Sequence, residues 1–204
     1  VGSKSLGFET RPQKTSEKQA AAAVGQAILM QIYQNFFNMY THTIAQILLT
    51  KTDFEDDARR ENIENTFDEL LSHGIVPIIN ANDTTSTYEI EFSDNDHLAA
   101  SVAVLLKADM LILLTDIDAL YDSDPRVNPE AKRIKIVEEV TSEIEQMAGT
   151  AGSKFSVGGM ATKISAAKYC ADNGIDMVIA NGKDAEIIER IVDGEDVGTL
   201  FIGK

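Results

Sequence analysis

Three things are scarce in this sequence: cysteine, long apolar runs and positive charge. A single cysteine, Cys170, cannot form an internal disulfide, and its place in a helical apolar pattern predicts a buried, unreactive thiol. No apolar run approaches the roughly 18–20 residues that a membrane span needs. The first residues also lack the charged and apolar regions of a secretory signal. These absences favour a cytoplasmic protein that does not act in a membrane.

The shortage of positive charge limits the partners. Lysine and arginine number 18 against 33 aspartate and glutamate residues, which gives a net charge of −15. Broad electrostatic attraction to nucleic acid is therefore excluded. A phosphate or another anion can bind only where backbone N–H groups or a few lysines create a local positive site, so the position of such a site is informative.

The apolar pattern alternates between short strands and amphipathic helices. Buried strands are expected at 43–50, 75–79, 111–115, 177–180 and 199–202, and an exposed strand at 88–92. Helices are expected at 17–40, after a Ser16-x-x-Gln19 capping box, and at 62–72, 97–107, 143–147, 160–173 and 185–192. This alternation predicts an α/β fold with a mostly parallel central sheet sandwiched by helices. We expect one domain over residues 1–204.

Polar residues gather where three of the predicted strands end. Asn80 and Asp83 follow one strand, Thr115 and Asp116 follow another, and the segment SDND (93–96) follows a third. In open parallel sheets, ligands bind beyond the carboxyl ends of the strands. The sequence therefore predicts a binding site at this edge, in preference to three solvated turns.

A glycine-rich segment supplies the local positive site. GSKFSVGGMATK (152–163) leads into a predicted helix, and its paired glycines allow backbone N–H groups to approach an anion. Lys163, in the first turn, can bring a full positive charge to the same phosphate. The segment is neither a Walker A loop nor a GxGxxG motif, and a plain flexible loop is an equally good interpretation of it alone.

The segment LILLTDIDALYDSDP (111–125) places four aspartates after a buried strand. An EF-hand is excluded, because Tyr121 stands where glycine is needed and Val127 where the closing glutamate belongs. A phosphatase-type nucleophile on Asp116-x-Asp118 has no convincing partner downstream. A third interpretation is that Thr115 and Asp116 hydrogen-bond a nucleotide or a catalytic lysine.

Seven segments over nearly the whole chain carry a resemblance to a known family: KQAAAAVGQ (18–26), AQILLT (45–50), VPIINANDTT (76–85), FSDNDHLAA (92–100), LILLTDIDALYDSDP (111–125), GGMATK (158–163) and GTLF (198–201). With these segments the sequence resembles the amino-acid kinase family, whose fold is of the carbamate kinase type, and within it the branch whose acceptor is L-glutamate.

The resemblance implies ATP-dependent phosphorylation of the side-chain carboxylate of L-glutamate to L-glutamyl 5-phosphate, the first step of proline biosynthesis. It implies no metal site built from protein residues, with Mg²⁺ bound through the nucleotide phosphates, and it implies feedback inhibition by proline. It also implies the site residues: Asn80, Asp83 and Asn95 for glutamate; Thr115, Asp116, Val157, Gly158, Gly159, Met160, Ala161, Thr162 and Lys163 for ATP; and Lys163 and Asp96 for catalysis, with Asp96 orienting catalytic lysines.

The sequence also departs from the family pattern. The chain opens at Val1 without a methionine and residues 1–14 have a loop-like composition, so we expect the family's first strand, its phosphate-contacting lysine and a Ser-Ser-Gly segment to be missing. The family's Gly-Thr-Gly-Gly-Met loop is Ser-Val-Gly-Gly-Met (156–160) here, and we expect no C-terminal RNA-modification-type domain. A related kinase with another carboxylate or carbamate acceptor, and a non-catalytic amino-acid-sensing module, stay open as alternatives. We expect a homo-oligomer, although the apolar face of helix 17–40 suits a core as well as a partner subunit.

Overall fold

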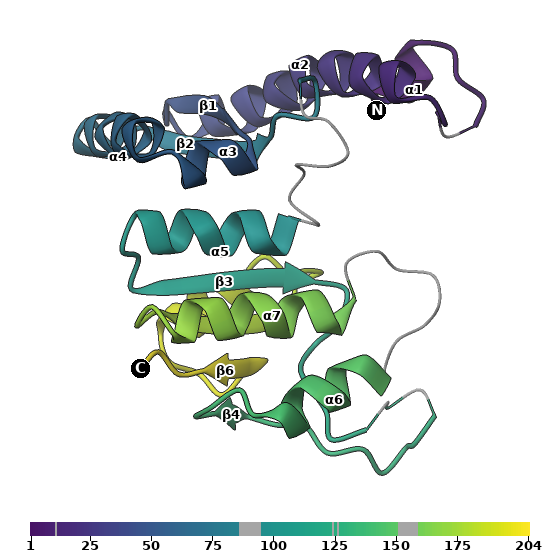
Figure 1. Ribbon diagram of the computed structural model, residues 1–204, viewed down its shortest axis with the longest axis vertical. Helices are drawn as coiled ribbons and strands as arrows, with labels where there is room; N and C mark the ends of the chain where they lie inside the picture. The colour runs from purple at the N-terminus through teal and green to yellow at the C-terminus, as the bar shows by residue number, and fades with distance from the viewer. Residues whose placement is uncertain (11, 86–94, 124, 126, 151–158) are drawn as a thin grey trace. The chain divides into compact units, whose positions relative to one another are not determined.

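The computed structural model describes residues 1–10, 12–85, 95–123, 125, 127–150 and 159–204, and Figure 1 shows the course of the chain. The chain divides into two compact units, an N-terminal unit (Val1–Phe92) and a C-terminal unit (Ser93–Lys204). Each unit has its own sheet and is described by itself. No helix in the described part of the chain is long and apolar enough to span a membrane.

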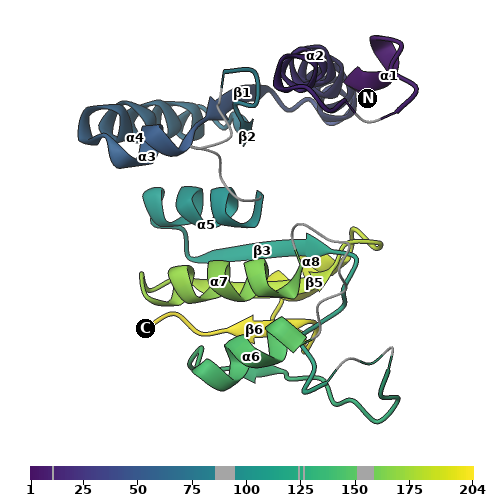
Figure 2. The same cartoon turned by 45° about the vertical axis from the view of Figure 1, so that its right-hand side comes forward.

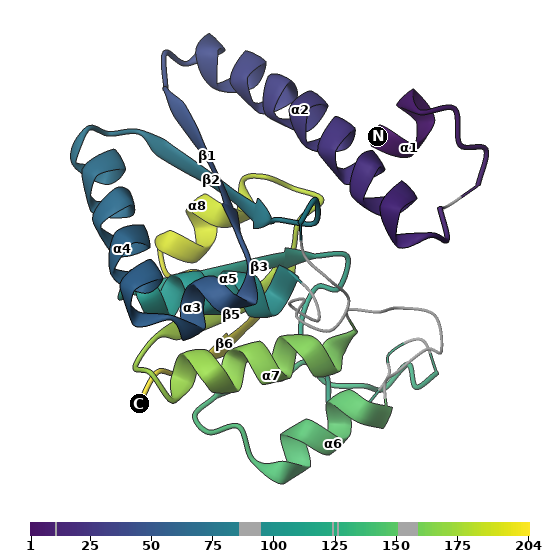
Figure 3. The ribbon, with the colours of Figure 1, turned by 45° about the horizontal axis from the view of Figure 1, so that its top comes forward.

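The N-terminal unit pairs two strands with four helices in its described residues. These elements are α1 (Gly2–Ser5), α2 (Thr15–Met39), β1 (Ile44–Leu49), α3 (Lys51–Glu55), α4 (Asp57–Ser72) and β2 (Val76–Ala81). β1 and β2 are parallel, in register from Ile44 opposite Val76 to Leu49 opposite Ala81. The short helix α1 lies against α2 (Figure 3), where a side chain on the buried Gly2 would collide with the carbonyl oxygen of Ala21. A glycine is therefore required for this close contact.

The C-terminal unit contains a four-stranded sheet with the order β3-β5-β6-β4. Its elements are α5 (Asn95–Leu105), β3 (Met110–Thr115), β4 (Ile136–Val137), α6 (Ser142–Thr150), α7 (Met160–Ala171), β5 (Asp176–Asn181), α8 (Ile187–Val192) and β6 (Thr199–Phe201). The pairs β3–β5 and β4–β6 are parallel, and β5–β6 is antiparallel. The sheet is thus mostly parallel, as expected.

Both faces of this sheet are covered by helices. Along β5 the side chains alternate: Met177 and Ile179 join the large core cluster with α5 and α7, while Val178 and Ala180 pack with Ile191 of α8. Figures 2 and 3 show α7 and α8 on opposite sides of the strands. A strand buried on both faces needs apolar residues at every position, which explains the uninterrupted run MVIA in the sequence.

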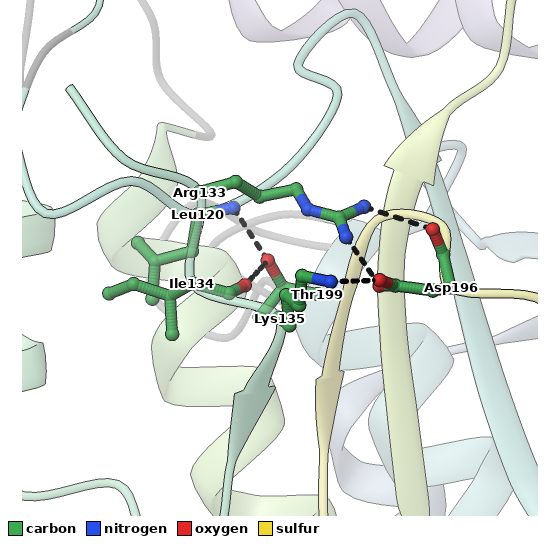
Figure 4. A network of polar contacts seen from close by, with 6 residues as sticks. All are labelled: Leu120, Arg133, Ile134, Lys135, Asp196 and Thr199. Atoms are coloured by element: carbon green, nitrogen blue, oxygen red, sulfur yellow. Dashed lines mark hydrogen bonds and ion pairs between the residues drawn. The ribbon is translucent and has the colours of Figure 1, made fainter. Parts of the chain in front are cut away.

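A buried threonine and an ion-pair network hold the long segment after β3 to the edge of this sheet (Figure 4). Thr199 is fully buried, and its Oγ1 donates to the carbonyl oxygen of Ile134 at 2.6 Å and accepts from the N–H of Leu120 at 2.9 Å. Nearby, Arg133 and Lys135 both pair with the carboxylate of Asp196. Because these contacts fix residues 120 and 133–135, the start of the segment, including Asp116, leaves the sheet from an anchored position.

Most of the expected elements are present, and four expectations need correction. The expected loop at 1–14 contains helix α1, and α4 begins at Asp57 instead of residue 62. The Ser16-x-x-Gln19 capping box is wrong: α2 begins at Thr15, two residues earlier than expected, and no side chain in the described residues caps it. A capping box occurs instead at Thr50, where Asp53 accepts from both the N–H and the hydroxyl of Thr50 at 2.7 Å and starts the unexpected α3. The described strands form two sheets, one in each unit, instead of one central sheet. The expected strand at 88–92 lies outside the described residues.

Candidate functional site

A cluster of polar contacts in the C-terminal unit joins the first turns of α5 and α7. Asp96 of α5 accepts from Thr162 Oγ1 at 2.8 Å and from Lys163 Nζ at 3.0 Å, both through its Oδ2. Lys163 is only 6% exposed and belongs to α7, which packs against α5. A buried ammonium needs a counter-charge and hydrogen-bond acceptors, and Asp96 provides both.

The N-terminus of α7 points backbone N–H groups toward the same place. Gly159 caps the helix in an extended conformation, and its carbonyl oxygen accepts from both the N–H and the hydroxyl of Thr162. The N–H groups of Met160 and Ala161, in the first turn, have no acceptor within the helix itself. Together with Lys163, this helix end can hold an anion. Val157 and Gly158, predicted for the same phosphate site, lie outside the described residues.

The carboxyl ends of β3 and β5 form a second polar group. Thr115 ends β3 opposite Asn181 of β5, and its hydroxyl donates to Asp116 Oδ1 at 3.1 Å. Asn181 Nδ2 donates to the carbonyl oxygen of Asp116 at 3.3 Å. Asn181 was not predicted from the sequence, although a signal was available: Asn181 is polar and directly follows the apolar run MVIA of β5. Asn181 therefore joins Thr115 and Asp116 as a candidate for the nucleotide side of the site.

The N-terminal unit contains a pocket of about 510 Å³ beside the end of β2. Lys18, Gln26, Asn80 and Asp83 contribute to its lining, together with α1. Asn80 Nδ2 donates to Gln26 Oε1 at 3.0 Å across the boundary between β2 and α2. Sequence reasoning named Asn80 and Asp83 but missed Gln26, which closes the segment KQAAAAVGQ. Because Gln19 also lines it, the pocket combines one cationic, one anionic and three amide side chains, a set that suits a zwitterionic amino acid.

The structure brings together some of the predicted site residues. Asp96, Thr162 and Lys163 form one contact cluster, and Asn95 is the neighbour of Asp96 at the exposed start of α5. Asn80 and Asp83 line the pocket of the other unit. In the described ranges, no group of three or more His, Cys, Asp or Glu side chains is arranged to hold a metal ion.

The remaining titratable residue of interest is the lone cysteine. Cys170 is fully buried in α7, and burial raises the pKa of its thiol to about 11. The thiol is therefore almost entirely protonated at neutral pH and a poor nucleophile. The prediction of a buried, unreactive cysteine is confirmed, and Cys170 belongs to the core rather than to the site.

Comparisons with known proteins agree on one family. The model of the Amino acid kinase family matches residues 3–181. Over the whole chain, the sequence is 52% identical to glutamate 5-kinase from Clostridium perfringens, of which the match covers 77%. It is 54% identical over 98% of the chain to glutamate 5-kinase from Clostridium acetobutylicum, with 74% of that protein covered.

Solved structures show the same fold at low sequence identity. UMP kinase from Bacillus anthracis matches 98% of the chain and 72% of its own, with a TM-score of 0.60 and 16% identity. Isopentenyl phosphate kinase from T. acidophilum matches 98% of the chain and 78% of its own, with a TM-score of 0.56 and 18% identity. These two likenesses concern the arrangement of helices and strands alone, and they agree with the predicted fold class.

Proposed function

Because the chain belongs to the amino acid kinase family, we propose that it catalyses ATP-dependent phosphorylation of the side-chain carboxylate of L-glutamate, the first step of proline biosynthesis. The observation that carries the chemistry is Lys163, a buried ammonium beside the N-terminus of α7 in a chain of net charge −15. The observation that carries the substrate is the identity of about half of all residues to two glutamate 5-kinases. The enzyme is therefore a kinase with a carboxylate acceptor.

The reaction makes modest chemical demands on the protein. A carboxylate oxygen of glutamate forms a bond to the γ-phosphorus of ATP, the bond from that phosphorus to the β–γ bridging oxygen breaks, and ADP leaves with the bond's electrons. The acceptor is already an anion at neutral pH, so no general base is required. Catalysis then depends on alignment and on neutralising the charge of the phosphoryl group. Lys163 and the backbone N–H groups at the start of α7 supply the positive charge that neutralises the phosphoryl group.

The division of roles follows from the sign of each charge. Lys163 contacts the migrating phosphoryl group, and Asp96 holds Lys163 in place. Thr115, Asp116 and the segment 157–163 bind the nucleotide. Asp83 meets the ammonium group of glutamate, since these two groups carry opposite charges. Asn80 and Asn95 bind the remaining polar groups of the amino acid.

Mg²⁺ fits this arrangement through the nucleotide. Phosphate oxygens are among its preferred ligands, and the described residues contain no group of three or more carboxylates or other ligands arranged to hold a metal ion. Bound to the phosphates, the ion would neutralise charge on the β- and γ-oxygens.

The test is an assay of the full-length protein with ATP, Mg²⁺ and a panel of acceptors. Glutamate-dependent release of ADP is expected, together with an acyl phosphate that hydroxylamine converts to a hydroxamate. ADP release with N-acetylglutamate, carbamate or UMP but not with glutamate would reassign the acceptor. Glutamate binding without turnover would instead indicate an amino-acid-sensing module.

Three finer points belong to the same proposal. The protein acts in the cytoplasm, proline inhibits it by competing for the amino-acid pocket, and the chain forms a homo-oligomer.

The proposed homo-oligomer has support in α2, whose exposed face carries Ile32, Phe36 and Met39, with Phe36 62% and Met39 75% exposed. Light scattering measures the mass in solution, and Phe36→Glu should lower it if this face contacts a second copy.

A further inference from the structure

Two amide side chains form a pair at the wall of the pocket in the N-terminal unit. Asn80 is the next-to-last residue of β2, and Gln26 lies in the middle of α2. Asn80 Nδ2 donates to Gln26 Oε1 at 3.0 Å, while Asn80 Oδ1 accepts from the N–H of Ala81 at 2.9 Å. The Asn80 amide is thus held on both its donor and its acceptor side, and its orientation is fixed.

Gln26 makes this contact at a cost to the fold. Its Nε2 is buried and has no hydrogen-bond partner among the residues that the structure describes. Buried polar atoms in proteins nearly always have partners, because an unsatisfied donor loses its hydration without compensation. Turning the Gln26 amide over does not remove the problem, since Nε2 would then face the donor Nδ2 of Asn80. A methionine or leucine at this position would carry no unsatisfied donor, although Asn80 Nδ2 would then lose its acceptor.

The location of the pair gives a reason for keeping it. Both residues line the pocket of about 510 Å³ that also receives Lys18 and Asp83. We infer that Gln26 is a positioning residue of the amino-acid pocket, because it fixes the Asn80 amide in the orientation that binds glutamate, the phosphoryl acceptor. The cost of this role is the unsatisfied donor Nε2 of Gln26. This inference rests on the proposed function, because it assigns the pocket to the acceptor.

The inference predicts that affinity and stability respond differently to one substitution. Gln26→Met keeps the length of the side chain and removes both its acceptor and its unsatisfied donor. The KM for glutamate should rise about tenfold, the effect of one weakened hydrogen bond of about 1.4 kcal/mol. The KM for ATP should stay within about twofold, and the melting temperature should stay the same or rise. Gln31→Met, at an exposed position of the same helix, is the matched control and should change none of the three.

A double-mutant cycle tests whether Gln26 acts through Asn80. If it does, Gln26→Met should add almost nothing to the KM of Asn80→Ala, whereas independent contributions would multiply. An unchanged glutamate KM in Gln26→Met would overturn the inference, and so would multiplicative effects in the cycle. A parallel rise of both KM values with a lower melting temperature would also overturn it, since that pattern indicates a structural role alone.

The failure of this inference is separable from the failure of the proposed function. If the unsubstituted full-length protein does not phosphorylate glutamate, the proposed function fails. Titration calorimetry with glutamate then replaces the KM in the same set of variants. A tenfold weaker binding to Gln26→Met would support the positioning role, and equal binding would overturn it.

Discussion

Replacing Asp96 by asparagine should cost the protein stability and activity together, and the contact with Lys163 sets the size of the effect. At the observed 3.0 Å, two unit charges attract each other by about 5.5 kcal/mol at an effective dielectric constant of about 20. Desolvation offsets part of that attraction in the native protein. Removing one partner of such a pair nevertheless leaves a buried charge alone, which typically costs about 3–5 kcal/mol.

The lower end of that range is expected for Asp96→Asn. The asparagine keeps an oxygen that can accept from Thr162, and the Asp96 side chain is 16% exposed, so water reaches part of the site. A loss of about 3 kcal/mol corresponds to a fall of about 6–12 °C in melting temperature for a chain of this size. Far-UV circular dichroism during heating of the full-length protein measures this fall.

The companion variant Lys163→Met separates stability from catalysis. It removes the buried ammonium itself, so Asp96→Asn in the Lys163→Met background should cost less than about 1 kcal/mol. The turnover of Lys163→Met should drop about 10²–10³-fold, as for other lost donors to developing charge, with little change in the KM for glutamate. Additive melting shifts for the two substitutions, or near-normal turnover of Lys163→Met, would refute the role of the Asp96–Lys163 pair.

Three further predictions concern the rest of the fold. Thr199→Val should lower the free energy of unfolding by about 1–3 kcal/mol, because it leaves the N–H of Leu120 and the carbonyl of Ile134 without their shared partner. A urea titration measures this loss, and Thr199→Ser should recover most of it. The Cys170 thiol, with its pKa raised to about 11 by burial, should react with a thiol reagent at pH 8 only after denaturant is added; fast labelling of the native protein would contradict its burial. Although partial burial opposes it, hydrogen bonds lower the pKa of Asp53, so its stabilisation is present above the ordinary value of 3.8 and disappears as the pH falls through the lower folded value. Asp53→Asn should therefore destabilise the protein at pH 7 and hardly at all at pH 2, and an equal loss at both values would show that the charge does not matter.

The sequence was sufficient for elements whose pattern is local. The run MVIA of β5 is apolar at every position, and the structure buries all four residues. The run LILL of β3 is apolar as well, but only Leu113 of it is buried and Leu114 is exposed. Gly174, just after the expected end of helix 160–173, adopts a positive φ of 77°, which favours the glycine that commonly follows a helix. Loop-like composition was misleading for residues 1–14, because α1 depends on the contact of Gly2 with α2 rather than on its own propensity.

The site was harder to predict because its contacts join distant parts of the chain. Asp96 and Lys163 are separated by 67 positions, and Asn80 and Gln26 by 54. Spacing within a motif carries no information about such pairs. The family resemblance supplied Asp96 and Asn80, but nothing in it marked Gln26 or Asn181 as partners. Those two residues emerged only from the hydrogen bond between Gln26 of α2 and Asn80 of β2 and from the alignment of β3 with β5.

The first turn of α5 places two recognition tasks on adjacent residues. Asn95 is proposed to touch the acceptor, and Asp96 holds the lysine proposed to touch the donor. Consecutive Cα atoms are only about 3.8 Å apart, so a ligand that tightens one residue restricts the other. Thermodynamic reciprocity then requires that nucleotide and amino acid alter each other's affinity by the same factor. If both proposed contacts are made, the start of α5 couples the two substrates, and each should change the affinity for the other.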